Sequence, residues 1–290
     1  MATVFPQGAV ALGLLFVLIV AGCGDGDDAD GATVSATTGI LADITERVAG
    51  EDATVEQVIP EGSTPHDFQL SAEDRASIED AALLVHNGAG LEQGVPVDEI
   101  DVPKFALADH AGPLLAGDPH VWMDPSRVAS ALPALADALA AADPDHAAGY
   151  RERAAALAGE LTALDRELAR ELEKVLAQDR ELVTSHDALG YFAERYGFEV
   201  VATAFPASGV EAEASAAGIR EVEDVVRRTG VPTVFAEHED DPEVIELIAE
   251  DTGVEIVDDL LVESPGSAGT YVEMLRHDAG LIAEGLGGER

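Results

Sequence analysis

Two histidines stand directly behind a proline, each where a loop gives way to the start of a possible helix. His66 lies in "EGSTPHDFQLSAED" and His120 lies in "GDPHVWMDP". The chain has only 8 histidines among its 290 residues, so the repeated placement needs an explanation. One explanation is a pair of solvated loops, and the other is a pair of ligands for one metal ion.

Two further polar side chains stand at comparable places later in the chain. His186 lies at the strand-to-helix turn "TSHDA", and Asp258 ends the expected strand "EIVDD". Side chains beyond the carboxyl ends of parallel strands gather at one edge of a sheet, so these four residues can converge. Their intervals of 54, 66 and 72 residues (120 − 66, 186 − 120 and 258 − 186) contain no local metal motif. Spacing alone is therefore only a weak indication of a shared metal site.

The donor types are more informative than the spacing. Three imidazoles and one carboxylate, with no thiolate, suit Zn²⁺ in tetrahedral geometry. Four protein ligands close the site, whereas a catalytic zinc keeps one position open for water, so the set favours carrying a metal over catalysis. The alternative is a secreted zinc hydrolase with Glu237 as its base. Against it, the chain has no H-E-x-x-H motif, and neither Ser185 nor Ser208 lies in a G-x-S-x-G context.

The elements that must position these residues alternate between strand-like and helix-like stretches from residue 32 onward. One stretch differs: residues 150–178 contain no proline, and their leucines recur at steps of three or four, which predicts one long helix. We expect an α/β fold of two lobes, each a parallel sheet flanked by helices, joined by this long rigid spine helix. The expected limits are an N-terminal lobe at 32–147, the spine at 148–178 and a C-terminal lobe at 179–290. A long surface helix on a single domain is the alternative.

Composition limits the partners. The formal net charge is −41 with only 16 Lys and Arg residues, so the phosphate backbone of a nucleic acid would be repelled. A hydrophobic content of 47% excludes a disordered chain. The acidic, lysine-poor surface fits either a salty environment or a GC-rich genome.

The N-terminus predicts export. An apolar run ends in small residues at "VAGC", which resembles a bacterial lipobox with Cys23 as its acylated residue. We therefore expect a signal peptide at 1–22, a lipidated Cys23, an acidic linker at 23–31 and attachment to the outer face of the cell membrane. Residues 1–22 contain no Lys or Arg, which departs from an ordinary signal peptide. Cys23 is the only cysteine, which excludes an intramolecular disulfide.

From residue 32 to the last helix, the chain resembles the zinc/manganese-binding solute-binding proteins of bacterial ABC importers. The segments that carry the resemblance are "PEGSTPHDFQLSAED", "ALLVHNGAGLE", "DPHVWMDPSRV", "LVTSHDALGYFAERYG", "TVFAEHED" and "VDDL". The resemblance implies a high-affinity extracytoplasmic receptor, not an enzyme, that acts as a monomer and delivers its metal to a membrane permease.

By the same resemblance the metal ligands are His66, His120, His186 and Asp258. A histidine at the third position resembles the zinc members of the family, where manganese members tend to carry glutamate, so zinc is the expected cargo. Manganese or iron is the alternative. The family usually reads "DP" where this chain has Asp258 and Asp259, so Asp259 is the alternative fourth ligand.

Overall fold

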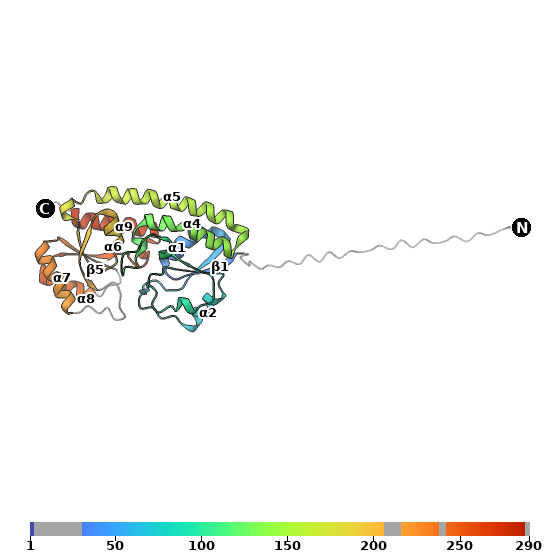
Figure 1. The fold of residues 1–290 in the computed structure, drawn as a ribbon, viewed down its shortest axis with the longest axis horizontal. Helices are drawn as coiled ribbons and strands as arrows, with labels where there is room; N and C mark the ends of the chain where they lie inside the picture. The colour runs from blue at the N-terminus through green and yellow to red at the C-terminus, as the bar shows by residue number, and fades with distance from the viewer. Residues whose placement is uncertain (3–30, 206–215, 238–241, 288–290) are drawn as a thin grey trace.

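The protein folds into two α/β lobes that lie side by side beneath one long helix (Figure 1). The structure is a computed structural model, and it describes residues 1–2, 31–205, 216–237 and 242–287. Cys23, Ser208 and most of the expected signal peptide and acidic linker lie outside the described residues. In the part of the chain that the structure describes, no helix combines the length and the apolar character needed to cross a bilayer.

Each lobe contains a four-stranded parallel sheet, as expected. The first sheet has the order β2-β1-β3-β4 and the second has the order β6-β5-β7-β8, so the two lobes repeat one topology. The first set of strands is β1 (Ala32–Ala36), β2 (Ala53–Gln57), β3 (Leu83–His86) and β4 (Lys104–Ala106). The second set is β5 (Glu181–His186), β6 (Glu199–Phe205), β7 (Thr233–Glu237) and β8 (Glu255–Leu260). All five residues of β7 are buried, as befits an inner strand covered on both faces.

Helices connect and cover the strands. In the first lobe they are α1 (Gly39–Ala49), α2 (Ala72–Asp80), α3 (Leu107–His110) and α4 (Pro125–Ala142). In the second lobe they are α6 (Gly190–Tyr196), α7 (Ala216–Thr229), α8 (Pro242–Thr252) and α9 (Tyr271–Gly287). Capping side chains fix where two of these helices begin. Ser71 and Asp74 form a capping box at the N-terminus of α2. Asp124 caps the N-terminus of α4, and Pro125 is in the first turn of that helix.

The spine helix α5 (Ala147–Leu172) runs across both lobes (Figure 1). Its 26 residues extend over about 39 Å. The helix ends earlier than the leucine spacing predicts, because Arg180 folds back and donates a hydrogen bond to the carbonyl oxygen of Leu172 at 3.0 Å. Leu176 consequently lies beyond the helix and is 59% exposed, while the leucines at 157, 161, 164, 168 and 172 are buried.

Polar contacts fasten the spine to each lobe. Arg153 on α5 donates to the carbonyl oxygen of Ala49 at the end of α1, at 2.6 Å. Near the other end, Arg195 on α6 pairs with the buried Asp165 of α5. One continuous apolar cluster extends from β1 through α4 and α5 to α9. The lobes therefore share a core and are not two bodies on a flexible linker.

Candidate metal centre

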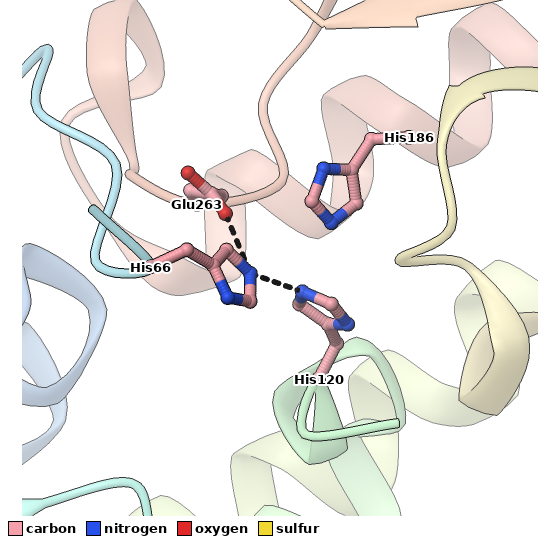
Figure 2. A group of neighbouring side chains, drawn as sticks. All are labelled: His66, His120, His186 and Glu263. Atoms are coloured by element: carbon pink, nitrogen blue, oxygen red, sulfur yellow. Dashed lines mark hydrogen bonds and ion pairs between the residues drawn. The ribbon is translucent and has the colours of Figure 1, made fainter. Parts of the chain in front are cut away.

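Three of the histidines expected at the sheet ends lie together between the lobes. His66 follows β2, His120 precedes α4, and His186 is the last residue of β5. Their ring centroids form a nearly equilateral triangle, with sides of 5.4, 5.3 and 5.1 Å. Figure 2 shows the three rings directed toward a common space. Loops at the carboxyl ends of both parallel sheets thus converge at one point.

A carboxylate completes the group, and it belongs to Glu263. One donor atom from each of His66, His120, His186 and Glu263 lies within 4.8 Å of the other three. His66 Nε2 lies 3.2 Å from His120 Nε2 and 3.2 Å from Glu263 Oε1 (Figure 2). Two atoms bound to one zinc ion at tetrahedral angles are about 3.3 Å apart, because each bond measures about 2.0–2.1 Å. Part of the group already has the spacing of metal ligands.

The structure does not bring Asp258 into this group. Asp258 lies within β8 and is exposed, and the strand continues to Leu260 before the chain turns toward the histidines. Asp259 is the other residue considered at this position, and its carboxylate lies 3.3 Å from His277 Nε2. Ligands at a parallel sheet come from beyond the strand end, and Glu263 is the acid that follows the end of β8. The sequence signal for Glu263 is a carboxylate between the strand and the proline turn "ESPG".

The surroundings lower the pKa of both His186 and Glu263, but burial contributes to this lowering only at His186. The pKa of His186 falls to about 4, first because burial disfavours the imidazolium and then because His120 lies beside it. Its Nε2 is buried and has no hydrogen-bond partner among the described residues. For Glu263, burial by itself raises the pKa, but the hydrogen bond from His66 and the neighbouring imidazoles outweigh it, and the pKa lies below the ordinary value. A neutral imidazole and an ionised carboxylate are the forms that bind metal.

The orientation of His120 is set by Asp118, two residues before it. Asp118 Oδ1 accepts hydrogen bonds from both the backbone N–H and the ring Nδ1 of His120, each at 2.8 Å. A carboxylate can only accept, so Nδ1 carries the proton and Nε2 presents its lone pair to the shared space. Sequence reasoning did not single out Asp118, although the Asp-x-His spacing is visible in "GDPHVW".

A second buried acid, Glu92, supports the loop that carries His120. Glu92 Oε1 accepts from Thr37 Oγ1 at 2.7 Å and from the backbone N–H of Asn87 at 2.6 Å. The Asn87 side-chain amide then donates to the carbonyl oxygen of Pro119 at 2.9 Å. The ends of β1 and β3 are thereby joined to the residue directly before His120.

Two α/β lobes with four potential metal ligands gathered in one place are the features of a metal-binding receptor. The family model described as "Zinc-uptake complex component A periplasmic" matches residues 34–285, and the chain belongs to this family. It is an extracytoplasmic metal-binding receptor of an ABC importer, whose partners are a metal ion and a permease, and not an enzyme.

Similar proteins carry names for three different metals. The manganese-binding lipoprotein MntA of Halalkalibacterium halodurans is 29% identical, with 94% of this chain and 96% of the relative covered. The iron-binding protein YfeA of Yersinia pestis is 30% identical, with coverage of 90% and 88%. The solved structure of the periplasmic zinc-binding protein TroA from Treponema pallidum superposes with a TM-score of 0.82 at 27% identity and covers 88% of this chain and 99% of that one.

Proposed function

We propose that this protein is a zinc receptor that binds one ion through His66, His120, His186 and Glu263 and delivers it to the permease of its importer. The observation that carries the proposal is the donor set: three imidazoles and one carboxylate, all buried or half-buried, within 4.8 Å of one another. Imidazole suits borderline-soft zinc, whereas a harder ion such as manganese prefers oxygen ligands.

The metal-free geometry supports an ion in this space. His66 Nε2 lies 3.2 Å from His120 Nε2 and 3.2 Å from Glu263 Oε1, so these two pairs of donor atoms already lie about as far apart as the ligands of one ion. To reach tetrahedral spacing, the widest donor separation has to contract by about 1.5 Å at most (4.8 − 3.3). Because the lobes share a core, we expect the loops that carry the ligands to move together while the lobes keep their positions.

Attachment to the membrane is part of the same proposal. MntA is a lipoprotein by name, and Cys23 of this chain stands in the lipobox-like "VAGC". A receptor anchored as a monomer through a lipidated Cys23 would stay beside its permease. Manganese and iron are the second candidates for the cargo, because relatives are named for each of them.

The test is a competition titration of metal-free protein, residues 24–290, with zinc and with manganese against a chromophoric chelator at fixed salt. We expect one zinc per chain, bound at nanomolar or tighter affinity, and a large loss of affinity in His66→Ala. Tight manganese binding with weak zinc binding would contradict the choice of cargo. The absence of any tight site would contradict the ligand set itself.

A further inference from the structure

Asp118 lies between a metal-binding histidine of one lobe and the first helix of the other lobe. One of its oxygens, Oδ1, holds the backbone and the ring of His120. The other, Oδ2, faces Gly190, the first residue of α6 in the second lobe. The Asp118 side chain is only 13% exposed, so it has little freedom to move away from either neighbour.

Gly190 has no space for a side chain. A Cβ atom built on Gly190 would approach Asp118 Oδ2 more closely than the 3.0 Å that real Cβ atoms respect, and would lie 3.5 Å from both Asp118 Cγ and Leu115 Cδ1. The φ angle of Gly190 is not among the positive values that require glycine, so the restriction is one of space alone. Alanine at this position would have to displace the carboxylate, and that carboxylate is fixed by two hydrogen bonds to His120.

The neighbouring residue strengthens the same contact. The buried hydroxyl of Tyr191 accepts from the backbone N–H of Leu115 at 2.9 Å and donates to the carbonyl oxygen of Asp118 at 3.1 Å. The turn from Leu115 to Asp118 is therefore held on α6 by two hydrogen bonds. Because α6 begins four residues after His186, the segments that carry His120 and His186 touch each other through Asp118.

We propose that Asp118 is a positioning residue that couples the metal ligands of the two lobes, and that residue 190 is a glycine because it leaves room for the Asp118 carboxylate that orients His120. The inference rests on the metal centre proposed above. Carboxylates that orient a ligating histidine typically contribute 10- to 100-fold to metal affinity. Displacing the carboxylate from either side should therefore weaken binding even though no ligand is changed.

Two other glycines provide matched controls. Gly159 lies in α5, where an added Cβ would meet nothing within 4 Å. Gly285 lies in α9, where an added Cβ would press against the ring of Phe235 at 2.9 Å and would contact neither Asp118 nor a proposed ligand. Gly285→Ala thus reproduces a steric overlap without touching Asp118, and Gly159→Ala introduces the same methyl group without an overlap.

The experiment measures zinc affinity by chelator competition for wild type, Asp118→Ala, Asp118→Asn, Gly190→Ala, the double variant Asp118→Ala/Gly190→Ala and the two glycine controls. We expect affinity losses of about 10- to 100-fold for Asp118→Ala and for Gly190→Ala. Asp118→Asn keeps an acceptor oxygen and should recover part of the loss. In the Asp118→Ala background, Gly190→Ala should have no further effect, because the group that it displaces is already gone. Gly159→Ala and Gly285→Ala should bind as wild type, whatever Gly285→Ala does to thermal stability.

A second readout works without metal. The ¹⁵N shifts of the His120 ring in metal-free protein report which nitrogen carries the proton, and we expect Nδ1 in wild type and a mixed population in Gly190→Ala. Unchanged affinity and ring shifts in Gly190→Ala would overturn the inference, as would losses that multiply in the double variant. If wild type binds no zinc, the proposed function fails, while the ring shifts still decide whether Gly190 controls the orientation of His120.

Discussion

Trp122 of the first lobe and Val262 of the second are joined by a hydrogen bond from the indole Nε1 to the backbone carbonyl oxygen, at 2.8 Å. Each partner is next to the proposed metal centre. The Trp122 ring meets the ring of His120 edge-on at 5.2 Å, and Val262 directly precedes Glu263. This bond thus fixes the position of Glu263 relative to His120 across the boundary between the lobes.

Replacing Trp122 with Phe should weaken both the fold and the site. The substitution removes the donor and leaves a buried carbonyl oxygen without its partner, which costs about 1–3 kcal/mol of unfolding free energy. The bond to Trp122 holds Val262, the residue before Glu263. Without it the Glu263 carboxylate is less firmly positioned, and zinc affinity should fall about tenfold. Chemical denaturation and chelator competition measure the two effects separately. A loss of stability with unchanged affinity would show that the bond supports the fold alone.

Replacing each of two acidic residues with its amide tests which one is the fourth ligand. Glu263→Gln should lower zinc affinity at least tenfold, because an amide is a poorer zinc ligand than a buried carboxylate 3.2 Å from His66. Asp258→Asn changes an exposed residue of β8 and should leave the affinity unchanged. Chelator competition on the two variants gives the answer directly. The opposite ranking would return the role to Asp258.

The histidines could be singled out from the sequence because each stands at a recognisable boundary, whereas the family resemblance made them an expected ligand set. A proline before His66 and His120, and a strand-to-helix turn at His186, mark the loops at the carboxyl ends of strands. Strand and helix alternation likewise predicted the two parallel sheets, and the leucine spacing predicted one long helix. These features depend on local pattern, which a single sequence contains.

The acid of the site depends on how far the chain runs beyond β8 along an irregular turn, and residue type alone does not give that distance. Asp258 and Glu263 are equally plausible ligands by residue type, but the last residues of β8 and the turn after them decide which one reaches the histidines. The end of the spine was missed for a similar reason. Arg180 bonds back to Leu172 from eight residues away, and this contact ends the helix before Leu176.

His186→Glu should shift the metal preference toward manganese. The substitution replaces an imidazole with a carboxylate, a harder donor, in a site that already contains Glu263. We expect zinc affinity to fall at least tenfold and the ratio of zinc to manganese affinity to narrow. His110→Glu is the matched control, because His110 is exposed on α3 and outside the cluster. An unchanged ratio in His186→Glu would remove His186 from the ligand set.

Zinc should stabilise the folded chain, because its proposed ligands come from both lobes and converge only when the protein is folded. A ligand that binds only the folded state at a free concentration a thousand times its dissociation constant adds about 4 kcal/mol. Thermal unfolding with zinc and then with excess chelator measures the gain and its reversal. The gain should shrink in Glu263→Gln and persist in Asp258→Asn. Equal stability with and without zinc would indicate that no enclosed site forms.

The metal-free protein should lose stability as the pH falls from about 6.5 to about 4. In the folded chain the pKa of His186 is about 4, because burial first and His120 second disfavour its protonation, whereas its ordinary value is 6.5. Between these two values the unfolded chain binds more protons, so the free energy of unfolding rises with pH across this window. His186→Asn removes the titrating group and should flatten this part of the profile. Denaturant unfolding in chelator from pH 4 to pH 7 provides the comparison, and identical slopes for wild type and His186→Asn would mean that His186 is not the buried neutral imidazole described here.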